Sequence, residues 1–273
     1  MSTASESRPT SAMEGQVLLR AEAVSKRFGG LQALDHVDLE VRKDEIVALI
    51  GPNGAGKTTF VNCLTGVERP SEGRILFKGA DLRSLPGYEI GKHGLARTFQ
   101  VMRPFRSMTV RENVAVGALF GRSTMRRSTH QAQEKADEIL KLTGLWAQRD
   151  MYASNLSVAQ SKRLELAKAL AMDPELLALD EVMAGLNAKE IDQAVSLIHE
   201  IATSGVTILV IEHVMKAILA LAGRIVVLHQ GRKIADGPPG SVMSDPAVVE
   251  AYLGERYARR VREQQAASST REN

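Results

Sequence analysis

The segment from residue 51 to residue 58 reads GPNGAGKT and combines residue types that bind phosphate. It matches the pattern G-x-x-x-x-G-K-[ST], in which backbone N–H groups surround phosphate oxygens, the lysine contacts the outer phosphates and the hydroxyl ligates Mg²⁺. The alternative is a glycine-rich turn without a ligand, but such a turn gives Lys57 no evident role. We therefore predict a nucleotide phosphate site. Its contacts are expected from Gly51, Asn53, Gly54, Ala55, Gly56, Lys57, Thr58 and Thr59.

Two carboxylates follow the apolar segment 176–179. At the carboxyl end of a parallel sheet, such groups point toward a ligand crevice. We predict that Asp180 holds Mg²⁺ through water and that Glu181 accepts a proton from the attacking water. An acidic turn after a strand would look the same in isolation, but the phosphate loop upstream favours the catalytic interpretation.

Strands and helices alternate along the chain and are needed to position these groups. Residues 17–23 and 37–41 alternate apolar and polar residues, as half-buried strands do. Continuous apolar segments at 46–50, 176–179, 206–211 and 225–228 are typical of strands buried on both faces. Helical patterns occur between them, at about 57–66, 131–142, 158–172, 188–203 and 213–222. The alternation predicts an α/β fold with a mainly parallel sheet.

The composition excludes several classes of protein. The 273 residues carry 35 lysines and arginines against 32 acidic residues, so a generally polycationic protein is excluded. The single cysteine, Cys63, excludes a disulfide framework and favours a reducing, cytosolic setting. Residues 1–14 lack the apolar region of a secretory signal, and no apolar segment approaches the roughly 18 residues of a membrane helix.

With its later motifs, the sequence resembles the ATP-binding subunit of an ABC transporter over residues 17–254. These motifs are TFQ at 98–100, LSVAQ at 156–160, AGLN at 184–187 and IEH at 211–213. The segments RFGGLQAL, NCLTG, RTFQ, IEHVM and AYLGE are most similar to ATPases of branched-chain amino acid importers.

This resemblance implies a P-loop NTPase core with an antiparallel N-terminal β subdomain and an inserted α-helical subdomain. The ATPase domain is expected at 15–254, with its core at 15–96 and 166–254 and the helical subdomain at about 97–165. Residues 1–14 are expected to form a disordered tail and residues 255–273 a charged tail.

The resemblance also implies roles for single residues. Phe28 would stack on adenine, although a half-buried phenylalanine at a strand end is the alternative. Gln100 would contact Mg²⁺ and the attacking water and sense the membrane partner. His213 would contact the γ-phosphate, although a histidine that opens a helix is often a polar cap. Asn187 replaces the aspartate that many members carry in the loop that crosses the dimer interface.

The segment LSVAQ departs from the family pattern L-S-G-G-Q. Ser157, Ala159 and Gln160 match residues that contact the γ-phosphate held by the opposite subunit, at a helix N-terminus with partial positive charge. Ala159 adds a methyl group where glycine is usual. Ser157 and Gln160 also form a capping-box pattern, S-x-x-Q, and both interpretations can hold together.

Residues 97–130 contain seven arginines and one glutamate, a net charge of +6. One interpretation is a basic face near the permease and the anionic lipid surface. The other is that the arginines pair with carboxylates elsewhere in the fold. The residues are Arg97, Arg103, Arg106, Arg111, Arg122, Arg126 and Arg127.

The resemblance implies an ATPase, with ATP and Mg²⁺, that powers a separate membrane permease importing branched-chain or related amino acids. Two cassettes, identical or paralogous, would close head-to-tail around two ATP molecules. A solute-binding protein would take part indirectly, no nucleic acid is expected, and the protein would lie on the cytoplasmic face of the cell membrane.

Three alternatives stay open from the sequence. Ala159 and Asn187 also suit an ATP-binding regulatory cassette with weak hydrolysis. A soluble ABC ATPase of DNA repair or translation would typically carry fused cassettes or coiled-coil insertions, and neither is visible. A GTPase or small-molecule kinase would leave 156–160 unexplained, and the guanine-reading motif N-K-x-D is absent.

Overall fold

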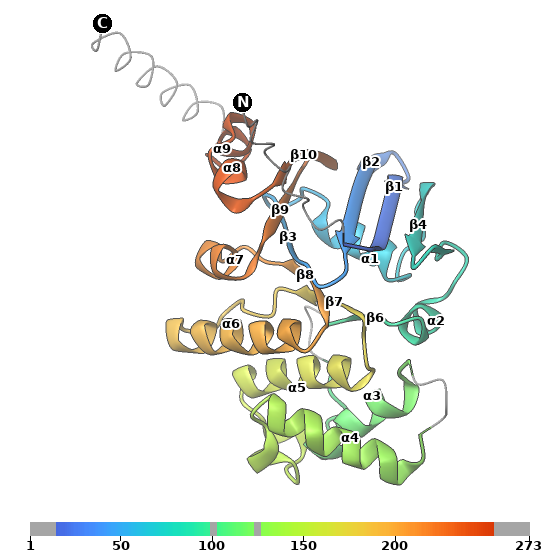
Figure 1. Ribbon diagram of the computed structural model, residues 1–273, viewed down its shortest axis with the longest axis vertical. Helices are drawn as coiled ribbons and strands as arrows, with labels where there is room; N and C mark the ends of the chain where they lie inside the picture. Colours follow the sequence, from blue (N-terminus) through green and yellow to red (C-terminus); the bar gives the residue numbers. More distant parts are fainter. Residues whose placement is uncertain (1–14, 99–102, 123–126, 254–273) are drawn as a thin grey trace, which may run out of the picture.

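Two β-sheets and the helices that pack on them make up the fold (Figure 1). The computed structural model describes residues 15–98, 103–122 and 127–253. One sheet contains β3 (Ile46–Ile50), β6 (Leu95–Arg97), β7 (Leu176–Asp180), β8 (Thr207–Ile211), β9 (Arg224–His229) and β10 (Arg232–Gly237). Its order is β10-β9-β3-β8-β7-β6, and β9 through β6 run parallel, whereas β10 is antiparallel to β9.

The second sheet is antiparallel, in the order β2-β1-β4-β5. Its strands are β1 (Val17–Phe28), β2 (Leu31–Arg42), β4 (Glu72–Phe77) and β5 (Ala80–Asp81). β1 and β2 are longer than the alternating segments predicted at 17–23 and 37–41. The pairing register shifts between Ala21 and Val24, and Ala23 has a positive φ of 47°. Such a bulge inserts a residue and interrupts the alternation that a sequence pattern can detect.

The larger helices of the middle of the chain pack against one another on the side of the six-stranded sheet away from β1 and β2 (Figure 1). α3 contacts both α4 and α5. The N-terminal side chains of α3, α4, α5 and α6 each form a reciprocal capping box, which fixes where these helices begin. The helices are α1 (Lys57–Leu64), α2 (Gly87–Lys92), α3 (Val110–Phe120), α4 (Thr129–Leu142), α5 (Val158–Ala171), α6 (Ala188–Thr203), α7 (Met215–Leu221), α8 (Pro239–Met243) and α9 (Pro246–Leu253).

The six-stranded sheet separates two apolar cores. In β3, Val47 and Leu49 face a core shared with the antiparallel sheet and α1, whereas Ala48 and Ile50 face a core shared with the middle helices. Because both faces are buried, these strands are continuously apolar, as the sequence predicted. Within the ranges described, no helix is long and apolar enough to cross a membrane. The architecture confirms the predicted fold class, while the subdomain boundaries stay a prediction.

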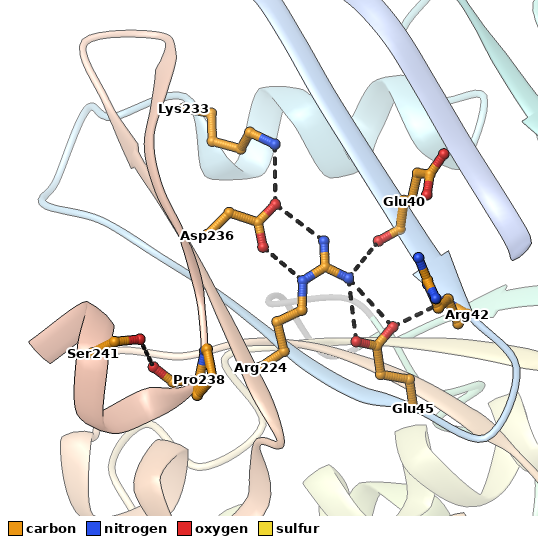
Figure 2. Close-up of polar contacts among 8 residues, drawn as sticks. All are labelled: Glu40, Arg42, Glu45, Arg224, Lys233, Asp236, Pro238 and Ser241. Carbon is orange, nitrogen blue, oxygen red and sulfur yellow. Dashed lines mark hydrogen bonds and ion pairs between the residues drawn. The ribbon is translucent and has the colours of Figure 1, made fainter. Parts of the chain in front are cut away.

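A cluster around Arg224 joins the two sheets at the amino end of β9 (Figure 2). Its Nε donates to Asp236 Oδ1 at 2.6 Å, and its Nη1 donates to the backbone oxygen of Glu40 in β2 at 3.1 Å and to Glu45 Oε1 at 3.2 Å. Lys233 Nζ also donates to Asp236 Oδ2, at 3.0 Å. The guanidinium therefore connects β2, β9, β10 and the residue that precedes β3.

Candidate nucleotide-binding site

The loop between β3 and α1 has the backbone shape that phosphate binding requires. Gly51 has φ of 153° and Gly56 has φ of 102°. A Cβ on Gly51 would lie 2.2 Å from the backbone oxygen of Leu228, and one on Gly56 would lie 2.8 Å from that of Ala33. Glycine is therefore required at both positions for conformation and for space.

Lys57 lies across this loop. Its Nζ donates to the backbone oxygens of Gly51 at 2.8 Å and Pro52 at 3.1 Å. Burial lowers the pKa of Lys57, and the negative charges of Glu181 and Asp180 oppose that shift. The ammonium group is therefore held at the loop, within the field of Glu181, the predicted base, and of Asp180, the predicted Mg²⁺ ligand.

An open cleft of about 680 Å³ lies beside the loop, within the range of about 300–1,000 Å³ usual for small-molecule sites. Phe28 lies in it with 44% of its surface exposed, and Lys26 Nζ is 4.8 Å from the centre of its ring. Glu181 also lines the cleft. The structure thus brings the residue predicted for adenine, most of the predicted phosphate loop and the predicted base Glu181 to one cavity. Gly51 and Asp180 are not among its lining residues. The lining includes Phe28, Asn53, Gly54, Ala55, Gly56, Lys57, Thr58, Thr59 and Glu181, together with Leu31, Gln32, Ala33, Gln230 and Gly231.

Asp180 ends β7 and is almost fully buried. Its Oδ2 accepts a hydrogen bond from Arg97 Nη2 at 2.6 Å, and its backbone N–H donates to Thr98 Oγ1 at 3.0 Å. Arg97 Nη1 also donates to Asn62 Oδ1 at 2.6 Å and to Thr65 Oγ1 at 3.3 Å, both in or next to α1. One guanidinium therefore ties Asp180 to the helix that follows the phosphate loop.

Glu181 and His213 follow adjacent strands. Glu181 has a positive φ of 49°, and its backbone N–H donates to the oxygen of Ile211 in β8 at 2.9 Å. His213 has 59% of its side chain exposed, and its Nδ1 is 4.0 Å from Oε2 of the buried Glu212. His213 does not line the cleft that holds Glu181. Gln100 lies outside the described residues.

The residues of LSVAQ lie at the start of α5 and are not among the residues that line the cleft of their own chain. Ser157 Oγ accepts from the Gln160 backbone N–H at 3.3 Å, and Gln160 Oε1 accepts from the Ser157 N–H at 2.9 Å. The capping-box interpretation is therefore confirmed. A hydroxyl that accepts a hydrogen bond keeps its own proton for donation, so this cap leaves Ser157 able to contact phosphate as well. Ala159 is half-buried beside this cap.

Asn187 is the N-cap of α6. Its Oδ1 accepts from the Glu190 backbone N–H at 3.0 Å, and Glu190 Oε2 accepts from the Asn187 N–H at 2.9 Å. Asparagine and aspartate are similarly effective caps. The departure from the usual aspartate therefore preserves the local structure while removing one negative charge from an exposed loop.

Four arginines of the basic segment pair with carboxylates within the fold. Arg111 contacts Asp137, Arg122 contacts Glu175 and Arg127 contacts Asp173, in addition to the Arg97–Asp180 pair. These pairs support the second interpretation for the arginines concerned. Arg103 and Arg106 are exposed, and Arg126 lies outside the described residues.

Sequence reasoning missed several residues next to the site. The sequence around Arg97 indicates its charge and its place in RTFQ, but nothing local signals that its partner lies 83 positions away. Gly231 donates from its backbone to the Ala55 oxygen at 3.0 Å. Burial raises the pKa of Tyr252 in α9, and the nearby backbone N–H of Gly51 opposes that shift. Tyr252 belongs to the segment AYLGE, whose similarity to importer ATPases predicts no role for this side chain.

The strand–loop–helix unit on a parallel sheet, with a buried aspartate and a glutamate at the end of β7, defines a P-loop ATPase. A family model described as ABC transporter matches residues 34–184, and one described as branched-chain amino acid ATP-binding cassette transporter matches 232–258. The chain belongs to the ABC transporter family and is one of its ATP-hydrolysing cassettes.

Individual relatives agree with this assignment. The high-affinity branched-chain amino acid transport ATP-binding protein LivG of Escherichia coli K12 is 43% identical over 252 residues, which cover 88% of this chain and 99% of that protein. BraF of Pseudomonas aeruginosa is 40% identical, with 87% and 98% covered. A solved ADP conformation of an ATP-binding cassette is 33% identical with a TM-score of 0.80 and covers 88% of this chain and all of the other. The predicted family is confirmed, and the comparisons give no support for a regulatory cassette.

The donor groups at the site suit Mg²⁺. Among the described residues there is no group of three or more histidine, cysteine, aspartate or glutamate side chains that could hold a metal on its own. Mg²⁺ is usually bound by one or two protein oxygens together with water and substrate phosphates. The hydroxyl of Thr58 and the carboxylate of Asp180 fit that pattern.

Proposed function

We propose that this chain hydrolyses ATP to power import of branched-chain or related amino acids through a separate permease. The cleft supports hydrolysis because Glu181 lines the same cavity as the phosphate loop. The proposed cargo rests on the match at 232–258 and on relatives that are named for branched-chain amino acid transport.

Each site residue has a role in this reaction. Phe28 stacks on adenine, and the backbone of 51–59 with Lys57 binds the phosphates. Thr58 and Asp180 would hold Mg²⁺, and Gln100 would contact the ion and the attacking water. When bound, the ion would neutralise charge on the outer phosphates. Glu181 accepts the proton of the attacking water, while His213 contacts the γ-phosphate.

Hydrolysis requires two cassettes in this proposal. Ser157, Ala159 and Gln160 are exposed or half-buried at the start of α5 and lie outside their own chain's cleft. In a head-to-tail pair they complete the ATP site of the opposite subunit, where the helix N-terminus supplies positive potential. Asn187 then lies in the loop at the interface. The second cassette is a copy of this chain or a paralogue.

Membrane partners complete the transporter. The cassette works on the cytoplasmic face of the membrane against permease subunits, which receive cargo from a solute-binding protein. The segment that contains Gln100 passes the conformational change to the permease.

The proposal is tested by reconstituting the chain with its permease, its partner cassette and the solute-binding protein in proteoliposomes. Hydrolysis of Mg²⁺-ATP and uptake of leucine, glutamine and a dicarboxylate are measured side by side, with Glu181→Gln as the inactive control. We expect leucine uptake that depends on ATP and disappears with Glu181→Gln. Hydrolysis without uptake of any amino acid would refute the proposed cargo, and hydrolysis unaffected by Glu181→Gln would refute the proposed base.

A further inference from the structure

The turn from Glu181 to Ala184 decides where the proposed catalytic carboxylate points. Glu181 has a positive φ of 49°, which is unfavourable for a non-glycine residue and persists where the surroundings enforce it. The backbone itself supplies two hydrogen bonds, Glu181 N–H to the Ile211 oxygen at 2.9 Å and Ala184 N–H to the Glu181 oxygen at 3.3 Å. Two charged side chains from other elements, Glu212 and Lys162, add further hydrogen bonds to the turn.

Glu212 holds the turn from the end of β8. Its side chain is fully buried. Oε1 accepts from the Met183 backbone N–H at 2.7 Å, and Oε2 accepts from the His213 N–H at 3.3 Å. Burial raises the pKa of Glu212, whereas these two N–H groups lower it. One buried carboxylate thus binds the backbone of both segments that carry the proposed catalytic side chains.

Lys162 holds the same turn from α5. Its Nζ donates to the backbone oxygen of Ala184 and, at 3.3 Å, to that of Glu181. Burial lowers the pKa of Lys162, and the charges of Glu212 and Glu181 oppose that shift. The ammonium group therefore lies between two carbonyl oxygens and within the field of a buried carboxylate.

Lys162 also belongs to the helix that begins at Ser157. Lys162 lies five positions after Ser157, which corresponds to roughly 7.5 Å along a helix axis. The residues at the start of this helix do not line the chain's own cleft, while Lys162 donates to the turn that carries Glu181. α5 is therefore a direct physical connection between the segment at Ser157 and the turn at Glu181, which the proposed function assigns to different ATP molecules.

We propose that Lys162 and Glu212 are positioning residues for Glu181, and that Lys162 links the placement of α5 to the conformation of the 181–184 turn. Binding of Ser157 to the partner subunit's ATP would then set Glu181 in its own subunit for hydrolysis. The inference rests on the proposed head-to-tail hydrolysis and adds the intrasubunit connection to it.

The test uses the reconstituted transporter and follows ATP hydrolysis against ATP concentration. The variants are Lys162→Met, Lys162→Arg and Glu212→Gln. The matched control is Lys189→Met, an exposed lysine of α6. ATP affinity is measured separately in a Glu181→Gln background, and thermal unfolding is measured for every variant.

We expect Lys162→Met and Glu212→Gln to lower kcat by about 10- to 100-fold, since small misplacement of a catalytic group has effects of this size. KM and ATP affinity should change little, because the cleft itself is intact. The cooperativity of hydrolysis with ATP concentration should fall in Lys162→Met. Lys162→Arg should restore most of kcat and cooperativity, and Lys189→Met should resemble the wild type.

Two results would overturn the inference. One is a wild-type kcat and cooperativity in Lys162→Met. The other is a kcat that falls as far in Lys162→Arg as in Lys162→Met, in proportion to the loss of thermal stability in each variant. If the wild type itself fails to hydrolyse ATP, or Glu181→Gln retains activity, the proposed function fails instead, so the two failures are distinguishable.

Discussion

Two arginines join neighbouring elements near opposite edges of the same six-stranded sheet, one where the parallel strands end and one where they begin. Arg97 ends β6 and binds Asp180, the last residue of β7, at the end of the sheet where the cleft lies. Arg224 begins β9 and binds Asp236 and Glu45 at the other end (Figure 2). Each guanidinium connects three or more elements. Both clusters rest on hydrogen-bonded pairs of arginine with carboxylate.

Their surroundings differ. The side chains of Arg97 and Asp180 are 7% and 1% exposed, whereas those of Arg224 and Asp236 are 23% and 22% exposed. Asp236 receives two hydrogen bonds from Arg224 and one from Lys233. The cluster at Arg224 serves to join the two sheets. The pair at Arg97 places a carboxylate that the proposed mechanism needs for Mg²⁺, so the buried pair serves the reaction as well as the fold.

The largest effect is expected from Arg97→Met. Without Arg97, the buried carboxylate of Asp180 loses its partner, and removing one partner of a buried pair typically destabilises a protein by about 3–5 kcal/mol. Hydrolysis should also fall, because α1, β6 and β7 lose the contact that fixes their relative positions. Urea unfolding of the nucleotide-free protein measures the first effect, and ATP turnover measures the second.

A double-mutant cycle isolates the pair. In an Asp180→Asn background, Arg97→Met should cost clearly less stability than in the wild type. The buried carboxylate that Arg97→Met leaves unpaired in the wild type is absent from this background. An equal loss in both backgrounds would show that Arg97 acts mainly through Asn62 and Thr65 of the α1 segment.

Arg224→Met should have a smaller effect. Hydrogen bonds to charged groups contribute about 1.5–3 kcal/mol each at most, and partial exposure reduces their value, so we expect a total loss of about 1–3 kcal/mol. The cluster lies away from the cleft, so ATP affinity should stay at the wild-type value. Urea unfolding and nucleotide titration of the same preparation test both statements. A loss of ATP affinity comparable to that of Arg97→Met would remove the distinction between the two clusters.

The sequence predicted the fold class and the cleft because their signals are local. The phosphate loop, the apolar strand before Asp180 and the capping pattern at Ser157 are each contained in fewer than ten residues. The helix predicted at 188–203 and that observed, α6, have the same bounds. In these cases sequence spacing alone fixes which side chains are neighbours.

The remaining parts depend on contacts between distant segments. Arg97 and Asp180 become neighbours only when β6 pairs with β7, and Lys162 and Glu212 approach the same turn only when α5 packs beside the sheet. No local pattern in the sequence reports either contact. The basic segment shows the same limit, since a net charge of +6 does not reveal that Arg111, Arg122 and Arg127 have carboxylate partners. The roles assigned to Phe28, Gln100 and His213 stay predictions until they are tested.

The smallest effect is a pH dependence at the Arg224 cluster. Burial by itself raises the pKa of Asp236, but the hydrogen bonds and charges of Arg224 and Lys233 outweigh it, so the pKa lies below the ordinary value of 3.8. A carboxyl group with a lowered pKa in the folded state contributes stability above its unfolded value, and that contribution is lost as the pH falls through the folded value. The stabilisation by Asp236 should therefore be complete at pH 7 and decline below about pH 4.

The measurement is the difference in the free energy of unfolding between the wild type and Asp236→Asn from pH 7 to pH 3. The difference should be constant at neutral pH and shrink below about pH 4, because protonated Asp236 resembles asparagine in charge. Asp150→Asn, which removes a carboxylate that is 74% exposed, gives the matched surface control. If the difference in unfolding free energy stays constant to pH 3, Asp236 acts through its shape and packing and not through its charge. The Arg224 cluster would then differ from the charged Arg97–Asp180 pair in the kind of interaction as well as in burial.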